Sequence, residues 1–512
     1  MTPLEVLRRY PAHDYSLQDA LASRARRIPE HSFIEFEDQR ISYAEACARV
    51  RETMALLASR GVKPGDRIAV MAHNHPSTVL LFIALASLGA MMVGVNPDFG
   101  EKEAHYVLEH SQSSGVVCSL AALATVQNVA DRLTARPWIM TNDRPLSGAA
   151  HDAPEPVGRA DDVCVLIYTS GTTGFPKGVM HSQRTVLLAG EGFVRRMHLD
   201  PAERILCLLP MFHVNALFYS LAGAIAAGAT LLLEGKFSAS KFWQIVAARK
   251  ATEVNTIAAM MNILMRRSRE EFAPGHTLRK IYGAPFSAEI YRVFEQEFGV
   301  PHLIEGYGMS EIPGVFSNPF DGERRKGSMG KPSLHPDPQV NLAQVKIVDD
   351  EGGEVPAGVT GEIAVRTPTI MKGYYRDPEA TAAAFRDGFF LTGDLGCRDA
   401  DGYFWFVARK KDIIRRRGEN ISGAEIDRVA GDHPEVVEAA AIGVPAELGE
   451  DEVLLAVVKK PGSRLTEQEL AAWCGARLAP FKVPRFVLFV DELPRTPTHR
   501  IAKFELRKDA TL

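Results

Sequence analysis

Paired cysteines and an excess of charge of one sign are both missing from this 512-residue chain. Its six cysteines stand far apart, so none forms a Cys-x-x-Cys zinc or redox pair, and scattered single thiols are typical of a reducing cytoplasm. Lysine and arginine number 59 against 63 aspartates and glutamates, which gives a formal net charge of −4. This balance does not favour a nucleic-acid-binding protein. The cysteines are Cys47, Cys118, Cys164, Cys207, Cys397 and Cys474.

We expect neither a signal peptide nor a membrane span. Residues 1–16 break into charge and proline before any long apolar segment appears, so we expect a cytoplasmic protein. Residues 79–95 and 205–233 carry no charge, but glycine and proline interrupt them, for example at Gly89 and Pro210. We interpret both as buried helix and strand of an α/β core.

Helical and strand patterns alternate along most of the chain. Residues 42–45 match a capping box, and the helix that follows stops at Gly61, before a strand expected at 67–71. Ser238 is placed to cap a second helix, and a strand is expected at 254–257. Such alternation predicts βαβ units with largely parallel sheets.

The pattern changes near residue 409, where a charged run begins and about 100 residues of compact α+β character follow. There we expect strands at 436–444, 454–458 and 486–490 and a helix at 467–478. We therefore predict an α/β fold with a large N-terminal domain of βαβ-rich sheets flanked by helices, and a small C-terminal α+β domain on a hinge. The predicted boundaries are 1–408, 409–412 for the hinge, and 413–512.

A glycine-rich loop follows the buried strand pattern at 163–168. Its glycines allow backbone amides to approach a phosphate, its hydroxyls donate hydrogen bonds, and Lys177 adds positive charge. Pro176 stands where a Walker A loop has glycine, so this is a different phosphate loop. The loop reads Thr169, Ser170, Gly171, Thr172, Thr173, Gly174, Phe175, Pro176, Lys177 and Gly178.

This loop and six further motifs resemble the adenylate-forming superfamily of acyl-CoA synthetases, luciferases and peptide-synthetase adenylation domains. The resemblance covers nearly the whole chain. Residues 210–243 are particularly similar to the crotonobetaine/carnitine-CoA ligase branch and its medium-chain fatty acyl-CoA ligase neighbours. The six motifs are, in order, 210–213, 282–285, 307–311, 392–394, 409–412 and 418–421.

The resemblance implies roles for the matching residues. Glu311 would hold Mg²⁺, a hard cation that prefers oxygen ligands, Asp394 would accept the ribose hydroxyls, and Arg409 would reach ribose or phosphate. Tyr307 would stack on adenine. The remaining residues implied for the ATP/AMP site are Gly283, Ala284 and Pro285 as a wall beside the base, and Gly308, Met309 and Ser310 near the nucleotide.

The resemblance also implies an ATP-dependent acid–CoA ligase, with ATP, Mg²⁺ and coenzyme A as its cofactors. A substrate carboxylate would attack the α-phosphate, pyrophosphate would leave, and the acyl-adenylate would then acylate CoA with release of AMP. The small domain would turn about a hinge at Lys411, and Gly418, Glu419 and Asn420 would line the CoA tunnel.

The C-terminal motif departs from the family pattern. His499 and Arg500 stand where the family carries glycine and the adenylation lysine, and arginine is not interchangeable with lysine at a tight site. Three interpretations stay open: Arg500 does the lysine's work, Lys503 replaces it, or adenylation is slow or lost. We favour the first. The catalytic candidates are Lys177, His213, Glu311, Arg409, Arg500 and Lys503.

The acyl pocket is expected around the motifs at 210–213 and 307–311, with His213 as the gate toward the CoA tunnel. The expected set offers no lone charge for a second carboxylate or an amino group, so we expect a short- to medium-chain carboxylic acid, with a carnitine-like acid as a variant. An amino-acid-type adenylation enzyme and a catalytically impaired nucleotide-binding homologue are the alternatives. We expect no nucleic-acid partner and no membrane span, and leave a homodimer open. The pocket residues are His213, Asn215, Phe218, Tyr219, Met309, Ile312 and Gly314.

Overall fold

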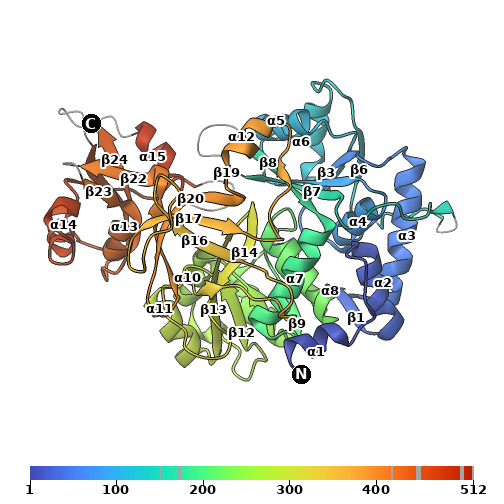
Figure 1. Ribbon diagram of the computed structural model, residues 1–512, viewed down its shortest axis with the longest axis horizontal. Helices are drawn as coiled ribbons and strands as arrows, with labels where there is room; N and C mark the ends of the chain where they lie inside the picture. Colours follow the sequence, from blue (N-terminus) through green and yellow to red (C-terminus); the bar gives the residue numbers. More distant parts are fainter. Residues whose placement is uncertain are drawn as a thin grey trace. The chain divides into compact units, whose positions relative to one another are not determined.

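The computed structural model describes residues 1–143, 145–149, 152–169, 176–416, 419–445, 451–495 and 501–509 (Figure 1). These residues fall into two compact units. Unit one contains the described residues up to Gln344 together with Arg366–Ala383, and unit two contains Val345–Val365 and the described residues from Ala384 onward. Residues 345–365 and 384–408, which we assigned to the large domain, therefore cluster with the C-terminal residues, and the boundary at 409–412 stays a prediction.

Unit one holds a seven-stranded sheet in the order β18-β8-β7-β4-β3-β5-β6. Strands β7, β4, β3, β5 and β6 run parallel, and β8 returns antiparallel to β7. Between β3 and β4 lies α4 (Pro76–Ser87), which is buried along its whole length. The predicted strand at 67–71 and the buried interpretation of 79–95 are confirmed. The strands are β3 (Arg67–Met71), β4 (Met91–Val95), β5 (Gly115–Cys118), β6 (Trp138–Thr141), β7 (Val163–Thr169), β8 (Lys177–Ser182) and β18 (Gly373–Tyr374).

Unit one also holds a nine-stranded sheet in the order β15-β14-β13-β12-β11-β9-β10-β1-β2. Its strands from β13 to β1 pair in parallel, and both edges are antiparallel. The uncharged run at 205–233 forms β9, a π-helix (Asn215–Leu221), α8 (Ala222–Ala227) and β10, as the buried-core interpretation predicts. The strands are β1 (Ser32–Phe36), β2 (Gln39–Ser42), β9 (Arg204–Cys207), β10 (Thr230–Leu233), β11 (Glu253–Asn255), β12 (Lys280–Gly283), β13 (His302–Met309), β14 (Ile312–Ser317) and β15 (Lys331–Pro332).

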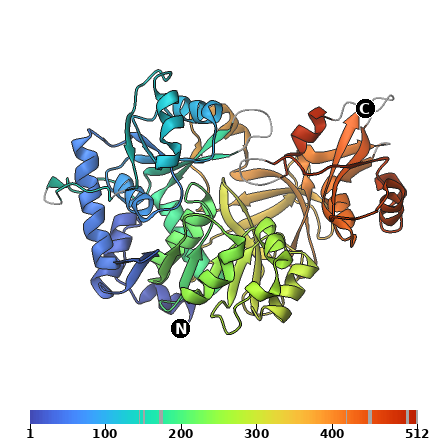
Figure 2. The ribbon, with the colours of Figure 1, turned by 180° about the vertical axis from the view of Figure 1, so that it is seen from behind.

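Helices cover these sheets, and local sequence signals set several of their ends. Ser42 and Glu45 form the expected capping box at the start of α3. The view from behind shows α2 and α3 packed together at the outer edge of unit one (Figure 2). The prediction for Ser238 is wrong, because a 3₁₀ turn precedes α9 and the Ser238 hydroxyl contacts that of Ser240. The helices are α1 (Pro3–Arg8), α2 (Leu17–Arg27), α3 (Tyr43–Ser59), α5 (Glu101–Ser111), α6 (Leu120–Ala130), α7 (Gln183–Met197), α9 (Phe242–Ala248), α10 (Ala258–Arg266), α11 (Ala288–Arg292) and α12 (Pro378–Ala383).

Unit two combines a five-stranded sheet, a two-stranded hairpin and a three-stranded sheet. Ile426, Leu455 and Leu470 belong to one apolar core that joins α13 and α14 to β25. The strands predicted at 436–444, 454–458 and 486–490 and the helix predicted at 467–478 all form. The elements are β16 (Gln344–Val348), β17 (Gly361–Arg366), β19 (Phe385–Arg386), β20 (Phe389–Arg398), β21 (Phe404–Arg409), β22 (Ile413–Arg416), β23 (Glu419–Ser422), α13 (Gly423–Gly431), β24 (Val436–Pro445), β25 (Asp451–Lys459), α14 (Glu467–Gly475), β26 (Phe486–Phe489) and α15 (Lys503–Asp509).

The architecture is thus the predicted mixture of a large α/β part and a smaller α+β part. None of the helices in the described ranges combines the length and apolar character that crossing a bilayer would need.

Candidate active site

A tight β-hairpin carries the motif at 307–311. Strands β13 and β14 pair antiparallel, with Met309 opposite Ile312, so Ser310 and Glu311 form the two-residue turn at the tip. A Cβ atom on Gly308 would lie 2.6 Å from the backbone nitrogen of Gly314. Glycine is therefore required at this close approach of the two strands.

His181 on β8 holds this tip in place. Its Nε2 lies 2.6 Å from the carbonyl oxygen of Ser310, and its ring is fully buried. Burial lowers the pKa of His181 to about 4, although the bond to Ser310 opposes the shift. The ring is therefore neutral near pH 7 and donates its Nε2 hydrogen to Ser310. We did not single out this histidine, yet it stands four residues after Lys177, on the same face of the strand.

Glu311 and Lys177 are linked through Tyr374. The buried Glu311 accepts a hydrogen bond of 2.9 Å from the Tyr374 hydroxyl, and the Lys177 Nζ lies 4.7 Å from the centroid of the same ring. Asp377 lies 4.0 Å from that ammonium group. Burial, and then the Glu311 charge, raise the pKa of Tyr374. The result is a cation and a buried carboxylate bridged by a neutral phenol. No spacing signal pointed to Tyr374 or Asp377, because both lie far along the chain from Lys177.

The residues predicted to surround adenine lie at neighbouring strand ends. Gly283 ends β12 and pairs with Glu305 of the parallel strand β13, and the Ala284–Pro285 peptide bond is cis. A Cβ on Gly283 would lie 2.8 Å from the carbonyl oxygen of Thr256. Tyr307 continues β13, with its ring 5.7 Å from that of Phe316. The carboxyl ends of parallel strands are where open α/β sheets bind ligands.

Unit two supplies Asp394 and Arg409 as a matched pair. They lie opposite each other on β20 and β21, with the Arg409 Nε 3.3 Å from an Asp394 carboxylate oxygen. Asp394 is 3% exposed, and its backbone N–H donates to the Thr392 hydroxyl at 3.1 Å. The predicted ribose carboxylate and its arginine are thus positioned by one hairpin.

The predicted acyl-pocket residues are all in unit one, on the loop and π-helix after β9 and on the β13–β14 hairpin. The Phe218 ring packs edge-on against His181, at 4.9 Å between centroids, so His181 contacts both the π-helix and the tip of the hairpin. Short π-helices are frequent at functional sites. One residue changes the expected character of the pocket. The Arg196 guanidinium lies over Tyr219 at 5.0 Å and donates to the Gly314 carbonyl at 2.9 Å, so a charged side chain that the expected set did not include contacts two of its members.

The remaining predicted residues divide into two groups. Ser170 to Gly174, Gly418, His499 and Arg500 lie outside the described residues. Lys411 is in a 3₁₀ turn at Lys410–Asp412, and Glu419 and Asn420 are in β23. Lys503 begins α15 and forms an ion pair with Asp427 of α13. Within the described ranges, no three histidine, cysteine or acidic side chains cluster so as to hold a metal ion.

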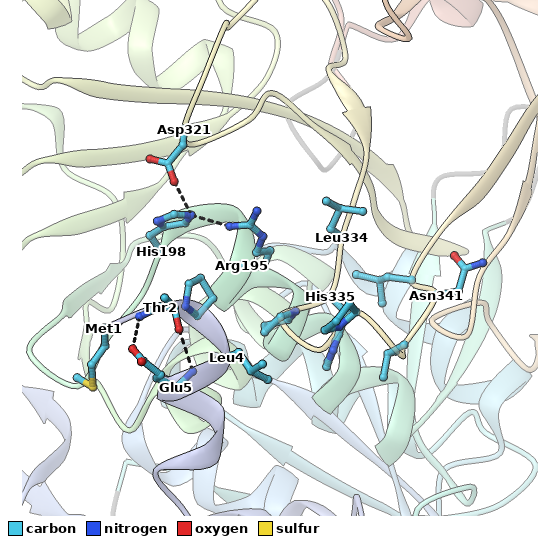
Figure 3. A pocket seen from close by; sticks show the side chains of 15 residues that line it. Met1, Thr2, Leu4, Glu5, Arg195, His198, Asp321, Leu334, His335 and Asn341 are labelled. Carbon is cyan, nitrogen blue, oxygen red and sulfur yellow. Dashed lines mark hydrogen bonds and ion pairs between the residues drawn. The ribbon is translucent and has the colours of Figure 1, made fainter.

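A hollow of about 920 Å³ lies elsewhere in unit one, between α1, the end of α7 and residues 334–342 (Figure 3). None of the predicted site residues lines it. His198 pairs with Asp321 at 3.4 Å and with Arg195 at 3.0 Å, and Thr2 and Glu5 bond to each other as a helix cap. Because these polar groups satisfy one another, we assign no ligand to this hollow.

Comparisons with known proteins show the family of this chain. The chain matches the family described as AMP-binding enzyme over residues 21–375 and the AMP-binding enzyme C-terminal domain over residues 425–500. It is 34% identical over 463 residues to a sulfoacetate–CoA ligase of Cupriavidus necator, which covers 88% of this chain and 89% of that one. It is 30% identical over 490 residues to a crotonobetaine/carnitine–CoA ligase of Salmonella paratyphi C, covering 92% and 93%. The crystal structure of ATP-bound MatB from Rhodopseudomonas palustris superimposes with a TM-score of 0.88 at 30% identity, covering 97% of this chain and 99% of that one.

The chain therefore belongs to the AMP-binding enzyme family, and the resemblance to adenylate-forming enzymes is confirmed. Within that family it is an AMP-forming acid–CoA ligase.

The pH dependence of stability in a His181 variant tests the role of this residue. The folded-state pKa of about 4 lies below the ordinary 6.5, so below pH 6.5 the unfolded chain takes up a proton that the folded chain does not, and stability is lost. At pH 5 this loss is about 2 kcal/mol. His181→Gln keeps a donor toward Ser310 but cannot titrate. We therefore expect its melting temperature to fall less between pH 7 and pH 5 than that of the wild type. Calorimetry across that range checks this. His433→Gln in unit two is the control, and equal losses in His181→Gln and wild type would contradict the assignment.

Proposed function

We propose that the enzyme joins a short- to medium-chain carboxylic acid to coenzyme A in two steps driven by ATP. The acid's carboxylate oxygen attacks the α-phosphorus of ATP, the bond to the β-phosphate oxygen breaks, and pyrophosphate leaves with the bonding electron pair. The CoA thiol then attacks the acyl carbonyl, loses its proton, and AMP leaves. A carnitine-like acid is the variant that the similarity to the crotonobetaine/carnitine–CoA ligase suggests.

The linked group of Lys177, Tyr374 and Glu311 carries this proposal. Attack brings an anion onto a polyanion, so the site must neutralise charge where it shifts. The Lys177 ammonium, 39% exposed beside the end of β7, supplies a positive charge next to the phosphate loop. Tyr374 holds the Glu311 carboxylate in one position.

Mg²⁺ fits these residues. It is commonly bound by one or two carboxylates together with substrate phosphates, and Glu311 is a buried carboxylate at a hairpin tip that Tyr374 links to Lys177. The ion would neutralise phosphate charge when bound. Glu311 would hold it, and Ser310 would contact the phosphates.

Residues of unit two also have roles in this proposal. Asp394 would accept the ribose hydroxyls, and Arg409, already paired with it, would reach ribose or phosphate. Lys411 would serve as the hinge that changes the small domain's orientation between the two steps, and Gly418, Glu419 and Asn420 would face CoA. A homodimer and a cytoplasmic location stay predictions.

The direct test is a screen of carboxylic acids with ATP and CoA, read as AMP plus pyrophosphate. We expect both products and an acyl-CoA thioester with at least one acid. Formation of ADP and phosphate would overturn the adenylation mechanism. ATP binding without acid-dependent AMP release would favour an impaired homologue, and turnover of amino acids alone would favour an amino-acid-type adenylation enzyme.

Pyrophosphate exchange distinguishes between Arg500 and Lys503 as the adenylation cation. The Lys503 ammonium is engaged with Asp427, which favours Arg500 as the adenylation cation. We expect Arg500→Ala to lower exchange about 100-fold, as loss of a charged contact in a transition state does. Lys503→Ala should keep exchange but lower the melting temperature, because Asp427 loses its partner. Lys482→Ala, which removes an ion pair to Glu425 on the same helix α13, is the control. Unchanged exchange in Arg500→Ala would refute our choice.

A further inference from the structure

Arg196 is a buried cation beside the predicted acyl pocket. It lies near the end of α7 and is 3% exposed. Its guanidinium carbon lies 5.0 Å from the ring centroid of Tyr219, 5.5 Å from that of Phe193 and 5.8 Å from that of Tyr282. Its Nη1 donates to the Gly314 carbonyl at 2.9 Å. Two of these partners, Tyr219 and Gly314, are residues that we assigned to the acyl pocket.

The charge of Arg196 is not balanced within the described residues. No ion pair joins it to a carboxylate there, and its Nε and Nη2 have no hydrogen-bond partner in the same ranges. Aromatic faces attract a cation and offset part of the cost of burial. They do not satisfy N–H donors, and buried polar groups are nearly always hydrogen-bonded. A buried arginine with two unmatched donors indicates an anion that binds there.

The hairpin explains how the guanidinium reaches this position. Gly314 has a φ of +64°, and a Cβ atom there would lie 2.5 Å from the Arg196 Nη1 and 2.8 Å from its Cζ. The missing side chain therefore leaves room for the guanidinium against β14. Glu311 is three residues earlier on the same hairpin, so its Cα lies at most about 10 Å from that of Gly314 at roughly 3.4 Å per strand residue. This separation is comparable to the length of a short acid.

We propose that Arg196 binds a second anionic group on the acid substrate, so that the enzyme activates short acids carrying a distal carboxylate or sulfonate. The inference rests on the proposed function and names its substrate class. The planar guanidinium fork suits a carboxylate or a sulfonate through paired hydrogen bonds. The same charge repels a quaternary ammonium group, so a carnitine-like acid is excluded by this assignment.

Matched acids test the proposal. Succinate and butyrate have the same number of carbon atoms and differ by the distal carboxylate. Sulfoacetate and malonate compare a distal sulfonate with a distal carboxylate. The acid 4-(trimethylammonio)butyrate carries a distal cation. In the wild type we expect kcat/KM for the better dianionic acid to exceed that for butyrate by about 100-fold or more, the usual consequence of leaving a buried charge unpaired. We expect no turnover of the ammonium acid. The sulfoacetate and malonate rates identify which anion is preferred.

Variants of Arg196 distinguish substrate recognition from a purely structural role. Arg196→Met, of similar length and uncharged, should lower kcat/KM for the dianionic acid about 100-fold or more and leave butyrate turnover equal or higher. Arg196→Lys should restore part of the preference. Arg195→Met is the matched control, because Arg195 is next on the same helix and contacts His198, and it should leave the ratio unchanged. A purely structural role for Arg196 would lower both rates alike.

The outcomes distinguish the two proposals. If no acid yields AMP and pyrophosphate, the proposed function fails. If butyrate or the ammonium acid is preferred, or if Arg196→Met lowers both rates equally, the inference about Arg196 fails while the ligase activity stands. If Arg196→Met does not fold, the wild-type acid preference and the Arg196→Lys ratio decide.

Discussion

Glu311→Gln is expected to lower the rate of acid-dependent pyrophosphate release by about 100- to 1,000-fold. The amide keeps an oxygen that accepts the bond from Tyr374, so the hairpin should stay in place. It removes the negative charge that would hold Mg²⁺ beside the phosphates, and a neutral amide is a poorer ligand for a hard cation. Pyrophosphate release at saturating acid, measured over a series of Mg²⁺ concentrations, checks this.

Tyr374→Phe is the companion variant. It keeps the ring beneath the Lys177 ammonium and removes only the hydroxyl that bonds to Glu311. A looser carboxylate should cost about 10-fold, far less than losing its charge. Full activity of Glu311→Gln at low Mg²⁺ would show that Glu311 holds no metal, and a larger loss in Tyr374→Phe than in Glu311→Gln would make Tyr374 the more important group.

Asp394→Ala is expected to raise the KM for ATP and lower kcat/KM for ATP by about 100-fold. The carboxylate is almost completely buried and lies opposite Arg409, so its loss removes the acceptor proposed for ribose and leaves Arg409 without its partner. Initial rates against ATP concentration, at fixed acid and CoA, measure this effect. The KM for the acid should change little, because the role proposed for Asp394 is in binding the nucleotide.

An exposed ion pair in the same unit supplies the control for Asp394. Asp350 pairs with Lys410 at 2.8 Å, but its side chain is 81% exposed, and such surface pairs are worth less than about 1 kcal/mol. Asp350→Ala should leave the KM for ATP unchanged. Equal effects of the two substitutions would contradict a role for Asp394 in nucleotide binding.

Local sequence signals predicted much of the fold. The capping box at Ser42 started α3 where expected, and the strand predicted at 67–71 formed as β3 with those bounds. These signals succeed because hydrogen bonds within a few residues decide helix ends, and the pattern of apolar side chains decides strands. Ser238 failed because an intervening 3₁₀ turn separates it from the helix that it was expected to cap.

The candidate site was predicted only where its residues follow one another in the chain. The motif at 307–311 and the Asp394 motif were found because each is a short, uninterrupted segment. Tyr374, His181 and Arg196 were missed because each contacts a partner that is distant in the sequence. The separations are 63 residues for Tyr374, 129 for His181 and 118 for Arg196. Nothing in the spacing of such residues shows which side chains meet across a sheet.

The phosphate loop and the ordered motifs are short segments of the chain, so the amino-acid sequence was enough to identify an adenylate-forming enzyme. What surrounds those motifs depends on how distant segments pack. Sheet pairing brings Tyr374 between Lys177 and Glu311, and the packing of α7 against the hairpin places Arg196 beside Gly314. A buried charge is recognised by its surroundings, and those surroundings exist only after the chain has folded.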